Sequence, residues 1–569
     1  MTLLTYLIYF AALVGLAWLL AAWIVRVYSG TLPSALLRTE AALLRLSGAA
    51  PDRGMGWGAY ALAVLTFNAT SFVLLYVLLR AQGALELNPD GIGGMAPDLA
   101  FNTAVSFVTN TNWQAYSGEA QLSYLSQMAG LTVQNFVSAG TGMAVAVTVI
   151  RGFVATKGST PGNFWIDLTQ SVLWILLPLS VMLALFLAWQ GVPQTLQGAV
   201  VATGIKGQEQ VIARGPAAAQ IAIKQLGTNG GGFFGVNSAH PFENPTIASN
   251  MAQSLSIMLI PVAFCFLFGR IAADRRQGSA IFAAMAVMFV AGLAVIHAYE
   301  VAGNPALGLG ANMEGKEQRF GAMLSALWAA SATAASNGSV NAMHDSFMPL
   351  SGLVMLVFMQ IGEVIFGGVG AGLYGMLLYV VLAVFLAGLM VGRAPEYLGR
   401  KIEGHEVTLA MPAFLSIPLN ILVAATVPQA LAAVQDAGPH GMSEILYAYS
   451  SATGNNGSAL GGFGAGLTWH TTALGIIMLL GRYAIIIPML AIAGSMIRKT
   501  QSPVTSGTLD KSRGQRHIRL LGPKSLLLFD LQRRLRCGMC RGRAELIITM
   551  PQTTIEALRK VASVIPYNA

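Results

Sequence analysis

The chain has 569 residues, of which 55% are hydrophobic and 10% are charged, with a mean hydropathy of +0.62. Because soluble domains carry about 25% charged residues, this composition excludes an ordinary soluble protein and indicates an integral membrane protein. The net charge of +9 is concentrated after residue 500, and the preceding part is nearly neutral. The charge therefore gives no reason to expect nucleic acid as a partner, and we expect membrane lipid instead.

The first apolar run, from Leu3 to Val25, is long enough to cross a bilayer. It lacks the basic start and the small-residue cleavage site of a signal peptide, so we predict a retained span at residues 1–26. The short stretch that follows is basic and carries Arg26, Arg38, Arg45 and Arg53. Since short basic loops favour the cytoplasm, we expect the N-terminus outside and the tail after residue 498 inside.

Four units follow, each predicted to be a helix, a pore loop and a second helix, at residues 57–154, 163–269, 278–392 and 409–498. Each contains a polar phrase between apolar runs: Thr111-Asn112-Trp113, Thr228-Asn229-Gly230-Gly231-Gly232, Ser336-Asn337-Gly338-Ser339 and Asn455-Asn456-Gly457-Ser458. The asparagines at 112, 229, 337 and 456 are separated by 117, 108 and 119 residues. Such near-equal periods indicate four copies of one unit, so the predicted fold class is an all-α polytopic membrane protein.

The polar phrases suit a binding site for a dehydrated cation. Irregular backbone inside a bilayer is tolerated only where protein buries it or where it lines a water-filled path, so the four loops should meet at one axis. Glycine, and to a lesser degree asparagine, reaches positive φ, which lets carbonyl oxygens turn toward a shared centre as in potassium filters. A single Asn-Gly step more often marks a simple turn, but four copies favour a filter. Its predicted residues are Thr111, Asn112, Asn229, Gly230, Gly231, Gly232, Asn337, Gly338, Asn456 and Gly457.

The second half of the third unit is about twice as long as one span requires, because apolar character persists from Phe347 to Val391. Its centre, Gly362 to Gly372, contains many glycines that a continuous helix would not favour. We predict a broken helix whose unwound centre lies in or near the pore. Two spans joined by a tight turn are the alternative, but the basic cluster that follows, Arg393, Arg400 and Lys401, fits a single inward crossing.

A few polar residues inside the apolar segments are candidate pore or gate residues. Arg482 lies in the middle of a span, where a charge is costly and should have a partner, and Glu363 beside the glycine-rich break is the natural one. This pair could gate the path together with Gly367 and Gly368, or it could be a strut between helices. Gln114, just past the first loop, could hydrogen-bond at the filter, line the exit or cap a helix.

Catalytic motifs are not evident in the sequence. Gly494 to Thr500 lacks the second glycine of a phosphate-binding loop, and His405-Glu406 lacks the second histidine of a metalloprotease. The Asp-Lys-Thr-Gly phosphorylation motif of P-type ATPases is missing as well. We therefore expect a protein without a catalytic site of its own.

Several longer phrases are distinctive: Phe107 to Gln114, Leu226 to Phe234 with His240 to Pro245, Val340 to Ser346, and Gly362 to Gly368. Over roughly residues 1–509 the chain resembles the KdpA family, the potassium-binding subunit of the bacterial potassium-transporting ATPase. The resemblance implies a potassium filter that faces outward, formed by Asn112, Gly230 to Gly232, Gly338 and Gly457. It also implies that Gln114 lies near the exit of this filter and Arg482 beside the broken helix around Glu363.

The same resemblance implies the partners and the location of the protein. The partners would be a P-type ATPase subunit that uses the ATP, a small single-span subunit and a tiny accessory subunit, all in the bacterial inner membrane. The transported ion K⁺ would be the only metal bound. A stand-alone potassium transporter of the same superfamily, driven by an ion gradient, is the alternative.

The C-terminus departs from the family pattern. Family members continue with another apolar span after a phrase like Gly507-Thr508-Leu509, whereas residues 501–569 of this chain form an atypical basic tail. A frameshift near Leu509 is one explanation, and a tail that binds anionic lipid is the other. Cys537 and Cys540 form a lone C-x-x-C in this tail, which is too few ligands for a zinc site.

Overall fold

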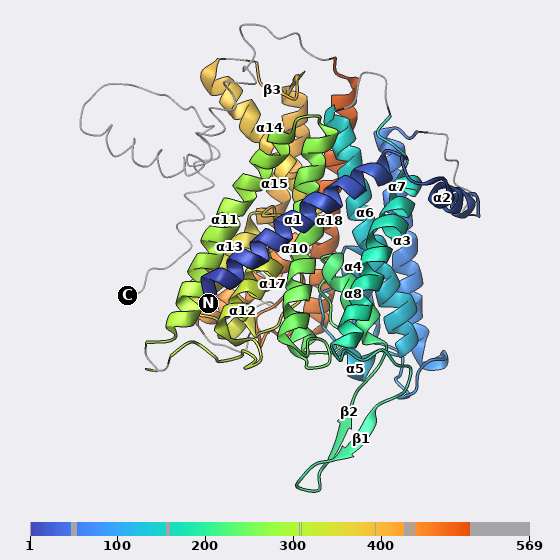
Figure 1. Ribbon diagram of the computed structural model, residues 1–569, viewed down its shortest axis with the longest axis vertical. Helices are drawn as coiled ribbons and strands as arrows, with labels where there is room; N and C mark the ends of the chain where they lie inside the picture. Colours follow the sequence, from blue (N-terminus) through green and yellow to red (C-terminus); the bar gives the residue numbers. More distant parts are fainter. Residues whose placement is uncertain are drawn as a thin grey trace. The chain divides into compact units, whose positions relative to one another are not determined.

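The computed structural model describes residues 2–46, 54–154, 160–305, 308, 310–392, 394–425, 434 and 438–500. In this part of the chain, nine helices are long and apolar enough to cross a membrane, and they run side by side through the helical body (Figure 1). The predicted all-α polytopic fold class, with an extra N-terminal span and a broken helix in the third unit, is confirmed. The tail at 501–569, with the suspected change near Leu509, lies outside the described residues.

The extra N-terminal span is α1 (Thr2–Tyr28), which packs along α10 (Ile247–Ile271) of the second unit. The Tyr9 hydroxyl donates to the Ser254 carbonyl at 3.0 Å across this contact. The next helix, α2 (Ser34–Leu46), is short and amphipathic. Its buried Glu40 accepts hydrogen bonds from Gln170 and Trp174, which ties α2 to the second unit.

The first two units follow the expected order of helix, pore helix, loop and helix. The first contains α3 (Trp57–Ala81), η1 (Gln82–Ala84), the pore helix α4 (Pro97–Val108), α5 (Gly118–Gln121), the π-helical turn η2 (Ser126–Thr132) and α6 (Val133–Val154). The second contains α7 (Phe164–Ser171), the π-helical turn η3 (Val172–Leu176), α8 (Leu177–Trp189), the pore helix α9 (Ala217–Leu226), η4 (Asn237–Ala239) and α10.

The second unit also carries a hairpin of β1 (Val200–Thr203) and β2 (Glu209–Ile212), antiparallel with Val200 opposite Ile212. It projects from the end of the helical body (Figure 1).

The third unit contains the broken helix. Its elements are α11 (Arg275–Ala302), the pore helix α12 (Gly321–Ala334), η5 (His344–Ser346), α13 (Pro349–Gln360), α14 (Ala371–Val391) and the small hairpin of β3 (Glu396–Tyr397) and β4 (Arg400–Lys401). The interruption covers residues 361–370, between α13 and α14, where Gly362, Glu363, Phe366, Gly367 and Gly370 all have positive φ. The fourth unit contains α15 (Gly404–Ala425), the pore helix α17 (Pro439–Gly454) and α18 (Thr468–Arg498).

The spans divide into inner and outer helices. The most apolar part of the helix at 126–154 is 83% buried inside the protein, and that of the helix at 247–271 is 78% buried. The most apolar part of the span that contains α3 is only 28% buried. The return helices of the first two units therefore form the centre of the bundle, while the entering helix α3 leaves most of its apolar surface exposed. Such a surface is what lipid contact requires.

One buried cation joins three units at the end of the bundle opposite the loops. Arg400 of β4 is 1% exposed, and its Nη1 donates to the Gly152 carbonyl at 2.8 Å and to the Met496 carbonyl at 2.6 Å. These carbonyls belong to the last turns of α6 and α18, where the negative end of the helix dipole favours a cation.

Candidate ion-binding site

The four pore helices end in the same backbone geometry. After each helix one residue takes positive φ: Asn110 (+67°), Thr228 (+49°), Ser336 (+53°) and Asn455 (+60°). The next amide then donates to the carbonyl five residues back, and the four pairs are Thr111 to Ser106, Asn229 to Lys224, Asn337 to Ala332 and Asn456 to Ser451, at 2.8–3.0 Å. The loops are therefore structural copies of one another.

This geometry corrects the predicted register of the first loop by one residue. Thr111, and not Asn112, is the counterpart of Asn229, Asn337 and Asn456. Asn112, the next residue, therefore occupies the position of the glycines 230, 338 and 457, of which Gly230 and Gly457 also have positive φ. Its φ of +52° is a conformation that asparagine tolerates better than most residues, which is why an asparagine can replace a glycine there. Aligning the loops by their asparagines alone missed this substitution.

The four loops converge. A Cβ added to Gly230 would lie 2.0 Å from the Gly338 nitrogen, and one added to Gly457 would lie 2.1 Å from the Thr111 oxygen. Between the third and fourth loops, a Cβ on Gly338 would lie 2.7 Å from the Asn456 oxygen. Since Asn110 Nδ2 also donates to the Gly227 and Thr228 carbonyls of the second loop, the loops contact one another in the order first, second, third, fourth and first.

The asparagine side chains hold this ring together. Asn337 Nδ2 donates to the Lys224 carbonyl at 3.3 Å, and Asn456 Nδ2 donates to the Ala332 carbonyl at 3.0 Å. Each of these bonds runs from one loop to the end of the preceding unit's pore helix. Asn229 Nδ2 likewise reaches Asn110 Oδ1 at 2.5 Å. The side chains of the three asparagines thus connect neighbouring units.

The pore helices add electrostatic attraction for a cation. The carboxyl ends of α4, α9, α12 and α17 all lead directly into the ring, because the loops begin where these helices end. A helix carries a partial negative charge at this end, equivalent to about half an elementary charge. Four such ends around one centre favour a positive ion.

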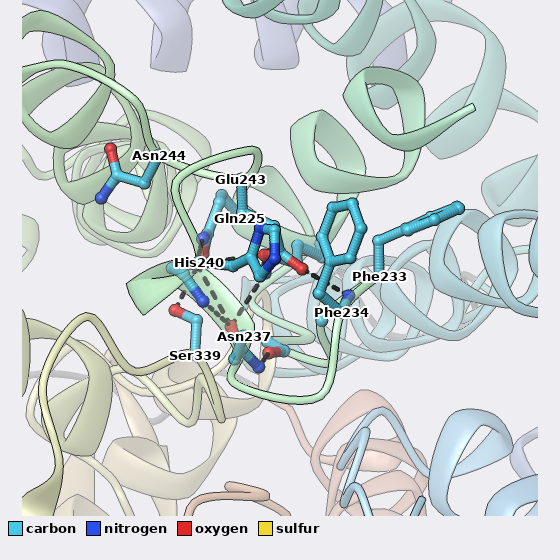
Figure 2. A network of polar contacts seen from close by, with 12 residues as sticks. Gln225, Phe233, Phe234, Asn237, His240, Glu243, Asn244 and Ser339 are labelled. Atoms are coloured by element: carbon cyan, nitrogen blue, oxygen red, sulfur yellow. Dashed lines mark hydrogen bonds and ion pairs between the residues drawn. The ribbon is translucent and has the colours of Figure 1, made fainter. Parts of the chain in front are cut away.

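The second loop is supported by a buried ion pair that the sequence analysis did not single out. Lys224 and Glu243 are both fully buried and form a salt bridge. Lys224 Nζ also donates to Asn237 Oδ1 at 2.9 Å, and Asn237 Nδ2 donates to the Gly230 carbonyl at 2.7 Å. Figure 2 shows Asn237 and Glu243 in this network, together with Gln225 and Ser339. Lys224 is the only charged residue of the pore helix α9, and this charge is the sequence signal that could have revealed the pair.

The same network contains an uncharged histidine. The His240 ring stacks on Phe234, with ring centroids 4.0 Å apart, as Figure 2 also shows. Burial lowers the pKa of His240 below its usual 6.5, so the stacked imidazole is neutral at pH 7.

Gln114 connects the first two loops. Its Oε1 accepts from the Gly232 amide at 2.9 Å and from Asn237 Nδ2 at 2.8 Å. Its Nε2 contacts the Gly232 and Phe234 carbonyls at 3.3 Å. Among the alternatives left open for this residue, the structure therefore shows hydrogen bonding to the loop of the second unit. Gly231 lies beside Asn112: a Cβ added to Gly231 would lie 2.8 Å from the Cβ of Asn112.

The interruption in the third unit packs directly against the ring. The Gly367 amide donates to the Ala334 carbonyl at 3.1 Å, and the Val369 amide donates to Thr228 Oγ1 at 2.9 Å. A Cβ on Gly368 would contact Ser336 at 3.3 Å. The broken helix therefore contacts the second and third loops, as expected for a segment next to the pore.

A small cavity adjoins this segment and contains both predicted gate charges. Its lining includes Glu363, Arg482, Ser336, Asn455 and Tyr374. Glu363 is 2% exposed, and neither of its carboxylate oxygens makes a hydrogen bond within the described part of the chain.

Arg482 is 6% exposed, and its Nη2 donates to the Ser138 carbonyl at 3.2 Å. In the described structure no salt bridge joins Glu363 and Arg482, so the expected ion pair is not formed even though both side chains line one space.

Fold and site together define a class: a polytopic α-helical membrane protein in which four re-entrant loops meet at one centre. The family described as potassium-transporting ATPase A subunit, KdpA, matches residues 7–522. The chain belongs to this family.

Curated relatives of similar length support this assignment. The potassium-transporting ATPase potassium-binding subunit of Rhodospirillum centenum is 59% identical over 520 residues, covering 89% of this chain and 91% of its own. The subunit of the same name from Sorangium cellulosum is 55% identical over 530 residues, covering 88% and 91%. Among solved structures, the potassium transporter TrkH of Vibrio parahaemolyticus has a TM-score of 0.51 at 15% identity, covering 84% of this chain and 96% of its own. That likeness concerns the fold alone.

Proposed function

We propose that this chain is the potassium-binding and potassium-passing subunit of an ATP-driven potassium uptake complex. The convergence of four equivalent loops carries the proposal, because a ring of carbonyl oxygens can replace the hydration shell of one monovalent cation. Carbonyls of residues 110–112, 228–230, 336–338 and 455–457 are the proposed ligands, with Gly231, Gly232 and Gln114 beside the ring. The curated relatives described above are named as potassium-binding subunits, which supports K⁺ as the ion.

The path inward would continue through the cavity beside the broken helix. Both carboxylate oxygens of Glu363 are buried and make no hydrogen bond in the described structure, so a cation that leaves the ring would supply the partner that they lack. Arg482, which lines the same cavity, would repel cations and so limit how many of them occupy it. Gly367 and Gly368 would form the wall between the ring and this cavity.

The partners would supply the energy. We propose a P-type ATPase subunit that uses ATP, together with a small single-span subunit and a tiny accessory subunit, in the bacterial inner membrane. The loops would open to the outside, with the N-terminus outside. A stand-alone transporter driven by an ion gradient has weaker support, because the likeness to TrkH is one of fold at 15% identity.

Two measurements test the function. The purified chain should bind K⁺ with a strong preference over Na⁺ in an equilibrium binding assay. Coexpressed with the subunits of its complex, it should give ATP hydrolysis that is stimulated by K⁺ and not by Na⁺. If the assembled complex hydrolyses ATP at the same rate with and without K⁺, the proposal is wrong.

A further inference from the structure

Three potential metal ligands meet between the third and fourth units, away from the ring. They are Asp345 of η5 and His440 and Glu444 of α17, and their ligand atoms all lie within 4.8 Å of one another. His440 Nε2 lies 2.7 Å from Asp345 Oδ1. The three side chains come from segments about 100 residues apart in sequence, so the fold and not local chain geometry brings them together.

The arrangement suits chelation. His440 and Glu444 are four residues apart on α17 and therefore lie on the same face of that helix, and Asp345 approaches them from η5. Glu444 is fully buried, whereas the side chain of His440 is 47% exposed. The cluster thus has an inner carboxylate and an outer imidazole that is partly exposed.

The donor set selects a class of ion. One imidazole nitrogen with two carboxylates suits divalent transition metals such as Zn²⁺. Ca²⁺ and Mg²⁺ prefer oxygen ligands and larger or octahedral shells. Three protein ligands with an open fourth position are also what an exchangeable Zn²⁺ site provides.

A chain of hydrogen bonds runs from this cluster to the fourth loop. His344, next to Asp345, contacts the Tyr447 hydroxyl at 2.8 Å through Nδ1, and Tyr447 contacts Ser458 Oγ at 3.1 Å. Ser458 Oγ then donates to Asn456 Oδ1 at 2.6 Å. Tyr447 lies one turn after Glu444 on α17. A shift of this helix would therefore displace the fourth loop, both through the backbone and through this series of hydrogen bonds.

We propose that Asp345, His440 and Glu444 bind a divalent transition-metal ion, and that the bound ion clamps η5 against α17 and slows potassium passage. The binding step stands on the geometry alone, whereas the inhibition rests on the proposed function. Because both segments adjoin the loops that would open outward, the ion would come from the outside medium.

The first experiment measures Zn²⁺ binding to the full chain. The chain is purified with an affinity tag that contains no histidine, so that the tag itself does not bind Zn²⁺. Cys537 and Cys540 are replaced by serine, because thiolates of the tail would bind Zn²⁺ themselves. The wild-type site should bind one Zn²⁺, and His440→Gln or Glu444→Gln should each weaken binding at least about tenfold. His405→Gln, an exposed histidine at the start of α15, is the matched control and should change nothing. Mg²⁺ and Ca²⁺ should not compete.

Equal Zn²⁺ binding by wild type, His440→Gln and Glu444→Gln, with all three eluting as the same folded species, would overturn the site. A loss of thermal stability in Asp345→Asn without any effect of Zn²⁺ on the wild type would also overturn it, because it would show an ordinary His–Asp contact.

The second experiment uses the assembled complex. Zn²⁺ should reduce potassium-stimulated ATP hydrolysis of the wild type, and His440→Gln should resist this inhibition while its activity without Zn²⁺ stays within about twofold. Bound Zn²⁺ with unchanged activity would refute the clamp. A complex that lacks any stimulation by K⁺ would instead refute the proposed function, so the two failures are distinguishable.

Discussion

Asn112 makes the ring asymmetric at the level of single residues. Its three counterparts are glycines, and only Asn112 has a side chain at this position. Its Nδ2 donates to Asn135 Oδ1 at 2.6 Å, which ties the first loop to its own return helix α6. The first loop is therefore anchored by a side chain where the others rely on close backbone contact.

Substitution of Gly457 should disturb the ring directly. Gly457 has φ of +104°, and a Cβ there would lie 2.1 Å from the Thr111 oxygen. Gly457→Ala should therefore reduce the preference for K⁺ over Na⁺ by at least about tenfold, a cost of about 1.4 kcal/mol, in the equilibrium binding assay. Gly466→Ala is the control, because nothing lies within 4 Å of a Cβ at that position. Equal effects of the two substitutions would contradict the assignment of Gly457 to the ring.

The buried pair of Lys224 and Glu243 makes a second prediction about single side chains. Lys224→Met would leave the Glu243 carboxylate buried without its cation, which costs about 3–5 kcal/mol. We expect a clearly lower midpoint of thermal unfolding in detergent. The double variant Lys224→Met with Glu243→Leu should recover much of this loss, because no unpaired charge remains. If the double variant is no more stable than the single one, the pair is not the source of the loss.

At the scale of elements, the break between α13 and α14 is determined by what it packs against. Gly372 could not carry a side chain, since a Cβ would lie 1.7 Å from the Phe366 oxygen. Gly370 has φ of +80°, and a Cβ there would lie 2.2 Å from the Gly142 oxygen of α6. The unwound segment is therefore held by close backbone contact with the first unit as well as with the ring.

Gly370→Ala should impair ion passage more than ion binding. The added methyl would push the break away from α6, whereas the hydrogen bonds between neighbouring loops do not involve Gly370. We expect K⁺ binding by the purified chain to stay within about threefold of wild type, whereas potassium-stimulated ATP hydrolysis of the complex falls at least tenfold. Gly352→Ala in α13 is the control, because its Cβ would meet no atom within 4 Å and alanine favours a helix. Parallel loss of binding and hydrolysis would indicate misfolding instead.

At the scale of the whole molecule, the end of the bundle opposite the loops holds basic residues. It carries the buried Arg400 and also Lys499, whose Nζ lies 2.6 Å from Glu406 Oε2. Arg275 and Arg276 begin α11 in a turn that joins two spans. The β1–β2 hairpin belongs to the connection on the pore-helix side of the second unit. Basic turns favour the cytoplasm, so the hairpin should be outside.

Cysteine labelling in cells tests this orientation. In a background without Cys265, Cys537 and Cys540, a cysteine at Ile205, at the exposed tip of the hairpin, should react with a membrane-impermeant maleimide applied from outside. A cysteine at Arg275 should react only after permeabilisation. The reverse pattern would invert the topology and with it the direction of the filter.

The amino-acid sequence alone determined the membrane class, the four units and the approximate place of each loop. Composition and the spacing of apolar runs depend on the bilayer, which imposes the same length and polarity on every span. The break at residues 361–370 was predictable for the same reason, because Gly362, Gly367 and Gly370 stand in an apolar run too long for one crossing.

Only the tertiary structure decided the register of the first loop, the absence of a salt bridge between Glu363 and Arg482 among the described residues, and the support of the second loop by Lys224, Asn237 and Glu243. These features depend on hydrogen bonds of the folded chain, from that between Thr111 and Ser106 to that between Arg482 and Ser138, which are 344 positions apart. Hydrophobic periodicity carries no information about such pairs. Asparagine and glycine can both take positive φ. The letters of a polar phrase therefore could not show that Asn112 stands where the other loops have glycine, whereas the hydrogen bonds of the folded backbone do.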